Sequence, residues 1–295
     1  MKNIKLFYFE SDSIKNFGDM LNIDICRKLF NVNPVFSPPL ECEAAFIGSL
    51  LDDFLYGKTK KLSMKFFRPY FKTPVQIWGS GFIADENQYI KRKYNLKETF
   101  NRRFNCHAVR GKLSLERLKK IDKLQNFNKT IIGDSGLLIS FLLKKQPSKQ
   151  YSAGIIPHHN EMDMPIWKEI QNNIKNSTII YVNDTVENVI NKVAQCDCIL
   201  SSAMHGLIAA DSLNIPNKRI IASNLIIGGN YKFNDYYSAF DINNHQFLDI
   251  RKNSPMGQKL IDLTTISSII DEYKIDKKLV ETIRDNLYNA FPYRN

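Results

Sequence analysis

Residues 197–216, DCILSSAMHGLIAADSLNIP, are predicted to form a strand, a turn and a helix in immediate succession. The apolar run Cys198–Leu200 has the length of a buried parallel strand, and apolar residues recur at helical spacing from Leu207 to Leu213. His205 therefore falls at the turn, beside the carboxyl end of the strand. In open α/β sheets ligands bind at that edge, and the free N–H groups of a helix start favour an anion. We infer a catalytic role for His205, because imidazole titrates near neutral pH and two serines and a glycine lie beside it.

Short apolar runs alternate with amphipathic helical segments along the rest of the chain as well. Further strands are expected at residues 4–9, 44–47, 74–78, 107–109, 130–132, 151–156, 178–182 and 219–222. From Ile261 onward the spacing of Leu279, Ile283 and Leu287 predicts helix. This alternation favours parallel sheets joined by right-handed crossovers.

The length of 295 residues is enough for two domains of ordinary size. Lys144–Gln150, KKQPSKQ, is polar and contains a proline, which makes it the best linker candidate. We therefore expect an α/β protein with one domain at residues 1–145 and another at residues 146–295, the second carrying the His205 turn and a C-terminal helix.

The composition is that of a soluble globular protein, because hydrophobic residues make up 43% of the chain and charged residues 24%. No apolar run approaches the roughly 18 residues of a membrane-spanning helix. The opening MKNIKLFYFE fits a strand better than a secretory signal, so a cytoplasmic location is expected. The five cysteines show no metal-ligand spacing and are expected to be buried, reduced thiols.

The net charge of +11 has several explanations. Its basic residues are scattered and no aromatic-and-basic recognition module is present, which argues against nucleic acid. Anionic small substrates, or the negatively charged inner face of a membrane, fit a scattered excess better. A compositional bias toward Lys, Asn and Ile without functional meaning stays open as well.

Several loops of the first half lie at the ligand-binding edge of its predicted sheet. Asn16, Gly18 and Asp19 follow the first strand, where Asp19 is expected to cap a helix and ligand contact by Asn16 and Gly18 is an open alternative. Asp134 is expected to cap a later helix. Each of these residues thus has a possible local structural role and also lies at the ligand-binding edge of the predicted sheet.

Two glycine–serine turns and one arginine complete this edge. Gly48-Ser49 and Gly79-Ser80-Gly81 follow strands and would let a backbone approach a bound group closely. Arg110 sits where a strand turns into a helix, and its planar fork suits a carboxylate or a phosphate. A surface salt bridge is the equally weighted alternative for Arg110.

Adjacent histidines follow a strand in the second half. In an extended chain His158 and His159 face opposite ways, and no third ligand is placed by the sequence, so we predict pocket lining and no metal. Glu161 belongs to the same loop. Ser201 and Ser202 can orient the imidazole of His205 or bind phosphate.

Together these motifs resemble the polysaccharide pyruvyl transferases. The matching pieces occur in family order over about residues 4–240: Asn16-Phe17-Gly18-Asp19, Trp78-Gly79-Ser80-Gly81, Arg110-Gly111, Gly133-Asp134, Ile156-Pro157-His158, Ser201-Ser202 with His205-Gly206, and Lys232-Phe233-Asn234-Asp235-Tyr236-Tyr237. The resemblance implies two Rossmann-like domains whose parallel sheets face a central cleft, as in GT-B glycosyltransferases. It also implies transfer of a pyruvyl group from phosphoenolpyruvate onto two hydroxyls of one sugar, forming a cyclic ketal with loss of phosphate.

The resemblance assigns roles to individual residues. It makes His205 the general acid and Arg110 a contact of the donor. Many members carry a donor-binding arginine where this chain has Ala203, so Lys232 or a neighbouring histidine would have to replace it. The predicted donor-binding residues are Arg110, Ser201, Ser202, Gly206, His158 and Lys232, and the predicted cleft loops contribute Asn16, Gly18, Asp19, Ser80, Gly81, Asp134, His159 and Glu161.

The chemistry suits these residues, because phosphoenolpyruvate carries about three negative charges near neutral pH and needs cations and free N–H groups. We expect no cofactor beyond this donor substrate, a lipid-linked or polymeric sugar of a bacterial surface polysaccharide as acceptor, and a cytoplasmic enzyme that can associate with the inner membrane face. The chief alternative is a GT-B-type glycosyltransferase with a nucleotide-sugar donor, although no ribose-binding carboxylate is evident near the His205 helix. A non-catalytic sugar-binding or scaffold protein is the third reading.

Overall fold

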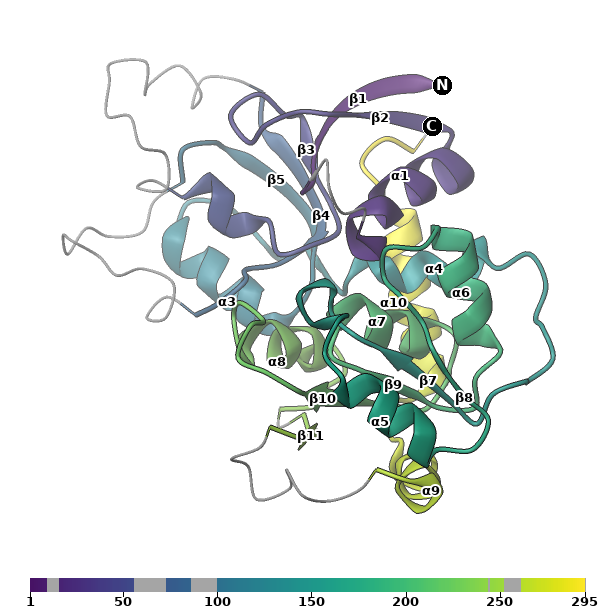
Figure 1. Ribbon diagram of the computed structural model, residues 1–295. Coiled ribbons are helices and arrows are strands. Elements are labelled where there is room, and N and C mark those ends of the chain that lie inside the picture. The colour runs from purple at the N-terminus through teal and green to yellow at the C-terminus, as the bar shows by residue number, and fades with distance from the viewer. Residues whose placement is uncertain (10–15, 56–72, 86–99, 244, 252–260, 295) are drawn as a thin grey trace.

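Two parallel β-sheets, each flanked by helices, make up the fold of the computed structural model, which describes residues 1–9, 16–55, 73–85, 100–243, 245–251 and 261–294 (Figure 1). The first sheet has the strand order β2-β1-β3-β4-β5-β6, and the second has the order β11-β10-β9-β7-β8. All neighbouring strands in both sheets are parallel. The predicted fold class, two Rossmann-like α/β domains with parallel sheets, is confirmed.

The first half contains one sheet and the helices around it. Its elements are β1 (Lys2–Phe7), α1 (Phe17–Phe30), β2 (Val32–Phe36), β3 (Ala44–Ala45), the 3₁₀-helix η1 (Leu51–Phe54), β4 (Val75–Ser80), β5 (Phe104–Val109), α3 (Lys112–Ile121), β6 (Ile131–Ile132), the 3₁₀-helix η4 (Ser135–Leu138) and α4 (Ile139–Leu142). The basic segment between the second and third predicted strands, residues 58–72, lies outside the described residues.

The second half repeats the pattern. Its elements are β7 (Ala153–Ile156), the 3₁₀-helix η5 (His159–Glu161), α5 (Ile166–Asn173), β8 (Ser177–Ile179), α6 (Val186–Ala194), β9 (Ile199–Ser201), α7 (Met204–Ser212), β10 (Asn217–Ile221), α8 (Tyr231–Ser238), β11 (Phe247–Asp249), α9 (Leu263–Glu272) and α10 (Lys277–Asn289). Every strand that we predicted is present.

Two strands were not predicted, and both lie at the edge of a sheet. β2 contains Pro34, whose missing N–H suits an edge strand and argues against a strand in the sequence. β11 is only three residues long, too short for a periodic signal. Edge strands are paired on one side only, so little of their sequence has to be apolar.

Local capping interactions fix where the helices begin. The side chain of Asn16 accepts a hydrogen bond from Gly18 N and caps α1, so the capping role that we expected for Asp19 is wrong and Asp19 occupies the first turn instead. Asp134 caps η4 as expected, by accepting from Gly136 N at 2.8 Å.

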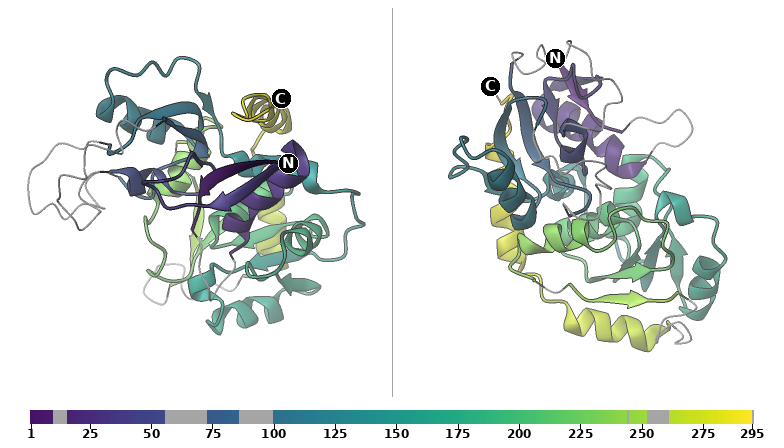
Figure 2. Two further views of the ribbon diagram at one scale, coloured as in Figure 1. Left: turned by 90° about the horizontal axis from the view of Figure 1, so that it is seen from above. Right: turned by 90° about the vertical axis from the view of Figure 1, so that its left-hand side faces the viewer.

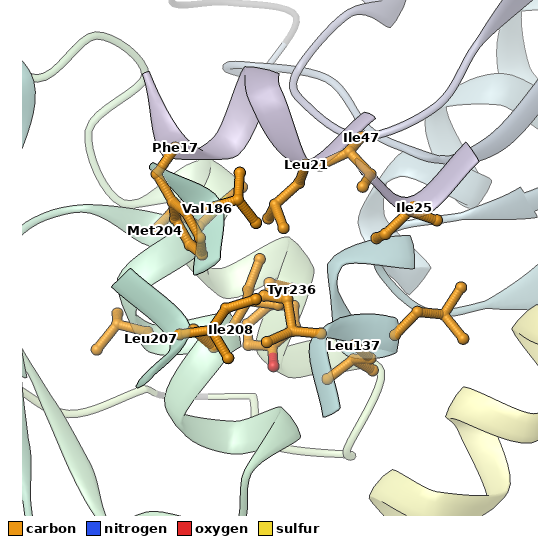
Figure 3. Close-up of a cluster of buried hydrophobic side chains, with 14 of the residues drawn as sticks. Phe17, Leu21, Ile25, Ile47, Leu137, Val186, Met204, Leu207, Ile208 and Tyr236 are labelled. Carbon is orange, nitrogen blue, oxygen red and sulfur yellow. The ribbon is translucent and has the colours of Figure 1, made fainter. Parts of the chain in front are cut away.

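An apolar layer joins the two halves (Figure 3). Phe17 and Leu21 on α1 pack in one buried cluster with Leu207 and Ile208 on α7, and all four side chains are fully buried. Tyr236 on α8 belongs to the same cluster. The helix α7, which carries His205 in its first turn, is therefore embedded between the halves, not exposed on the second one.

A buried ion pair crosses the same junction. Arg110, at the end of β5, donates from Nε to Asp235 Oδ2 on α8 at 2.9 Å, and both side chains are fully buried. Asp235 also accepts from the backbone N–H and the hydroxyl of Ser114, each at 2.7 Å. A Cβ on Gly111 would lie 1.7 Å from the Asp235 carbonyl oxygen, so only glycine allows this approach.

These contacts revise the donor-binding role that we predicted for Arg110. Its Nη1 donates to Ser49 Oγ at 2.7 Å and its Nη2 donates to the Phe82 carbonyl oxygen. A Cβ on Gly81 would lie 2.6 Å from the Arg110 Cζ atom, so Gly81 makes room for the guanidinium and not for a ligand. Because a carboxylate already neutralises its charge, Arg110 is a structural residue of the domain junction.

The C-terminal helix returns to the first half. We assigned α10 to residues 146–295, but the indole N–H of Trp78 donates to the Leu287 carbonyl oxygen at 2.9 Å, and Phe291 stacks on Phe30 with ring centroids 3.8 Å apart. Figure 2 shows this helix running alongside both halves. The boundary at residues 145 and 146 stays a prediction, because the chain crosses the junction more than once.

The expectation of buried, reduced thiols agrees with the structure. All five cysteines are free, and four of them are buried while Cys106 is partly exposed. Burial raises the pKa of each thiol to about 12. Within the described ranges no helix combines the length and the apolar character that crossing a membrane requires.

Replacing Arg110 with alanine should lower the free energy of unfolding by about 3–5 kcal/mol, because Asp235 would remain as a buried charge without its cation. Lys112→Ala is the matched control. Its ion pair with Asp241 joins the same two segments, but the two side chains are 42% and 79% exposed, so the change should stay within about 1 kcal/mol. Urea unfolding followed by tryptophan fluorescence measures both losses, and equal losses would contradict the role of the buried pair.

Candidate functional site

Each sheet has one point where the winding of the chain reverses. In the first sheet the strands before and after it are β1 and β3, and in the second they are β7 and β9. Adjacent connections diverge there at the carboxyl ends of the strands, which opens the crevice where such sheets bind ligands. Asn16 and Gly18 follow β1, His158 follows β7, and His205 follows β9. The predicted site residues thus flank both reversal points.

The two reversal points meet at Gly18 and His205. A Cβ on Gly18 would lie 2.0 Å from His205 Nδ1 and 2.5 Å from its Cε1, so the imidazole lies directly against the Gly18 backbone. Phe17 N also donates to the carbonyl oxygen of Val182, which follows β8, at 2.6 Å. His205 is therefore held between the two halves, and Gly18 is needed because it has no side chain.

The imidazole of His205 is in an environment that disfavours its charged form. Burial, together with the positive charges of Lys232 and Arg110, lowers its pKa to about 3. Its buried Nε2 has no hydrogen-bond partner among the described residues. His205 is neutral at pH 7, with one ring nitrogen left for a ligand or a proton.

His158 and His159 lie on the same side of this site. His158 N donates to Ser202 Oγ at 2.8 Å, and the two imidazole rings are 4.1 Å apart. Burial, followed by the charges of Lys232, His159 and His205, lowers the pKa of His158 to about 3. The loop after β7 and the turn after β9 are thus brought together, and the expectation that the two rings face opposite ways is wrong, because the chain enters the 3₁₀-helix η5 at His159 and does not stay extended.

Lys232 is the cation that the fold brings to these histidines. It lies in the first turn of α8, is 8% exposed, and forms no ion pair with any described carboxylate. Burial lowers its pKa to about 7, and Arg110 and Arg219 act in the same direction while Glu161 opposes them. A buried amine without a carboxylate partner is costly and favours binding of an anion.

Three carboxyl groups border the site. Glu161 is buried and accepts from Ser223 Oγ, while its Oε2 has no partner in the described structure. Burial raises the pKa of Asp134 to about 6 and that of Asp19 to about 7, the latter against a hydrogen bond from Asn16. Both aspartates can therefore exchange a proton near neutral pH.

Some predicted site residues have structural roles instead. Ser201 Oγ lies 3.0 Å from the Ile156 carbonyl oxygen and accepts from Ala203 N at 3.0 Å, so its hydroxyl stabilises the turn after β9. A Cβ on Gly206 would lie 2.5 Å from that hydroxyl oxygen. Ser80 Oγ donates to the Gly48 carbonyl oxygen at 2.9 Å. We revise the ligand roles predicted for these three residues, because their neighbours already use the space or the hydroxyl.

Arg219 and Asp235 were not among the predicted site residues. Arg219 follows Asn217 and Lys218 in the polar first part of β10, so no local pattern marks it as a buried cation. Asp235 lies in the KFNDYY segment that supports the family resemblance. The described residues contain no group of three or more His, Cys, Asp or Glu side chains that could hold a metal ion. Independence from metals and cofactors stays a prediction.

The family model described as polysaccharide pyruvyl transferase matches residues 4–217. The uncharacterised protein L143 of Acanthamoeba polyphaga mimivirus is 27% identical over 259 residues, which cover 83% of this chain and 77% of the relative. Two structures of the wall teichoic acid polymerase TagF align with 98% and 97% of this chain and 88% of their own, at 9% and 10% identity and TM-scores of 0.42 and 0.39. Scores this low support no statement about function.

The charge state of His205 can be tested by an NMR pH titration of the histidine ring signals. Its signals should stay constant from about pH 8 to about pH 5, because its pKa lies near 3 and not near the ordinary 6.5. Lys232→Met should raise the pKa of His205 and of His158, since it removes a neighbouring positive charge. Lys218→Met, the control, should instead raise the pKa of His245. Titration of wild-type His205 near pH 6.5 would overturn this description.

Proposed function

This chain belongs to the polysaccharide pyruvyl transferase family, whose model matches residues 4–217, and we propose that it transfers a pyruvyl group from phosphoenolpyruvate onto two hydroxyls of one sugar. The product is a cyclic ketal and the leaving group is phosphate. The observation that carries this proposal is the buried, unpaired Lys232 beside a neutral His205. The site has a cation and a proton carrier together, and the cation forms no ion pair with any described carboxylate.

The donor would bind between Lys232 and the start of α7. No side chain caps α7 at Ala203, and Gly206 N donates to the Ala203 carbonyl oxygen at 3.1 Å, so the N–H groups of Met204 and His205 are the ones available to the carboxylate or the phosphate of the donor. Ala203 stands where many family members have an arginine, and Lys232 supplies a positive charge from a different helix. Ser202 and His158 complete the polar wall on the side of β7.

Donor binding would also charge the catalytic histidine. An anion beside the imidazole raises its pKa, because the opposite charge stabilises the protonated form. The protonated His205 then gives its proton to the methylene carbon of the donor while a sugar hydroxyl attacks the neighbouring carbon. The second hydroxyl attacks the same carbon and displaces phosphate. Asp19 and Asp134, whose pKa values lie near neutrality, are the candidates that accept the hydroxyl protons.

The acceptor in this proposal is a sugar of a surface polysaccharide, either polymeric or still linked to a lipid. The net charge of +11 would favour binding of the enzyme to an anionic membrane face. No cofactor takes part, because side chains supply the charge and the proton. A glycosyltransferase that uses a nucleotide sugar remains the alternative, and weighing the product separates the two, since only one of them adds a pyruvyl group.

Turnover with phosphoenolpyruvate should fall by about 10²–10⁴-fold in His205→Ala, because the general acid is lost. Mass spectrometry of the acceptor after incubation with this donor measures the rate. His107→Ala is the matched control, since His107 lies on β5 and contacts Gln76 outside the site. Unfolding curves like that of the wild type would show that both variants are folded. A His205→Ala rate above about a tenth of the wild-type rate would remove His205 from catalysis.

Binding of phosphoenolpyruvate alone tests the donor site without an acceptor. Lys232→Met should weaken the affinity at least about tenfold in isothermal titration calorimetry, because one buried charge partner is lost, whereas Lys218→Met should leave the affinity unchanged. Bound donor should also raise the pKa of His205 in the wild type. Equal affinities of the two variants would place the donor elsewhere.

A further inference from the structure

A cavity with polar lining residues lies where the two halves meet. It has a volume of about 490 Å³, and its walls include Leu113 on α3, Arg219 on β10, Ser223 after that strand, and Asn230 and Asn234 at the start of α8. We call it the junction pocket. His158, His205 and Lys232 do not line it, so it is separate from the proposed donor site.

Arg219 is the buried cation of the junction pocket. It is 3% exposed and forms no ion pair with any described carboxylate, and its Nε has no hydrogen-bond partner there. Its Nη2 donates to the Gly229 carbonyl oxygen at 3.3 Å, and its guanidinium lies 3.6 Å from the centroid of the Phe233 ring. An aromatic face offsets only part of the cost of burying a positive charge, so the group is suited to an anionic ligand.

The pocket offers further hydrogen-bonding groups around Arg219. Asn230 and Asn234 are four residues apart on one side of α8, and neither side-chain amide makes a hydrogen bond within the described structure. Ser223 contributes a hydroxyl that also contacts Glu161. Asp85 is the lining carboxylate, and Arg251, the second lining cation, forms an ion pair with Asp249 at 2.5 Å, so Arg219 is the lining cation without a described carboxylate partner.

The junction pocket shares part of its lining with a larger cavity. Asn230, Asn234 and Phe247 also line a neighbouring cavity of about 890 Å³ between β11 and α9. A three-carbon donor cannot fill both spaces, whereas a sugar with attached residues can. The pocket also adjoins the donor site, because Arg219 is close enough to lower the pKa of Lys232.

We propose that the junction pocket binds an anionic group of the acceptor, through Arg219, and so positions the sugar hydroxyls beside the donor. This rests on the proposed function. The anion is a phosphate next to the sugar, as in a lipid-linked precursor, or the carboxylate of a uronic acid. Both present oxygen atoms that the guanidinium can bind in a fork geometry. Acceptors without a charged group would then be poor substrates.

Calorimetric titrations of the whole protein with glucose 1-phosphate, glucuronate and glucose, with and without saturating phosphoenolpyruvate, test this inference. At least one anionic sugar should bind about tenfold more tightly than glucose, whether or not the donor is present. Which of the two binds identifies phosphate or carboxylate as the anion. Arg219→Gln should abolish the difference and leave donor affinity unchanged.

Arg284→Gln is the matched control, because Arg284 also stacks on an aromatic ring, that of Phe141 at 4.6 Å, but lies on α10 outside the pocket. It should bind all ligands like the wild type. If Arg219→Gln fails to fold, a double variant is used in its place. The double variant Asn230→Ala and Asn234→Ala should lower the affinity for the anionic sugar at least about threefold, since it removes two side-chain amides that have no hydrogen-bond partner in the described structure.

Two results of these titrations would overturn the inference: equal binding of all three sugars, or displacement of the anionic sugar by phosphoenolpyruvate. In a further titration with cytidine diphosphate, an Arg219-dependent preference for this nucleotide over both anionic sugars would overturn it as well. The last result would assign the pocket to a nucleotide-sugar donor. Failure of the proposed function is recognised separately, because the wild type would then not bind phosphoenolpyruvate in the same titrations.

Discussion

The buried ion pair between Arg110 and Asp235 is the interaction on which the rest of the structure depends. It joins the carboxyl edge of the first sheet to α8 of the second half, where neither charge has access to water. A pair of this kind is stable only when both partners are present and fully hydrogen-bonded, and Ser114 and Ser49 supply the remaining contacts. Because α8 is fixed in this way, Lys232 in its first turn is held beside His205.

The glycines of the junction are needed for the space that they leave. Gly18 faces the imidazole of His205, Gly81 faces the guanidinium of Arg110, and Gly111 faces the backbone of α8. None of the three has a positive φ, in contrast to Gly79 at +85°. We expected the turn at Gly81 to let a backbone approach a bound ligand. In the structure Gly81 makes room for the Arg110 guanidinium within the first half, whereas Gly18 and Gly111 let the two halves of the protein approach each other.

The site beside this junction has an excess of positive charge. Lys232 and Arg219 are buried without ion-pair partners, and His205 is kept neutral by burial and by its cationic neighbours. In the empty protein this arrangement costs stability, since burying an unpaired charge is unfavourable. An anionic donor at Lys232 and an anionic acceptor group at Arg219 would each supply a missing partner. The proposed acid role of His205 depends on donor binding as well, because only a nearby anion brings the pKa of His205 toward neutral pH.

The sequence by itself determined the class of the fold and the place of His205. Strand and helix periodicity are local, and a residue after a buried parallel strand must lie at the ligand-binding edge. It also indicated the capping role of Asp134. The tertiary structure alone decided which of the predicted cations already has a carboxylate partner. Arg110 and Asp235 are 125 positions apart, and the contact that neutralises the arginine appears in no local pattern. Lys232 was a candidate from the family resemblance and Arg219 was not, but only the fold decided that both are buried without a described carboxylate partner, because the role of a buried charge is set by the groups that the fold brings near it.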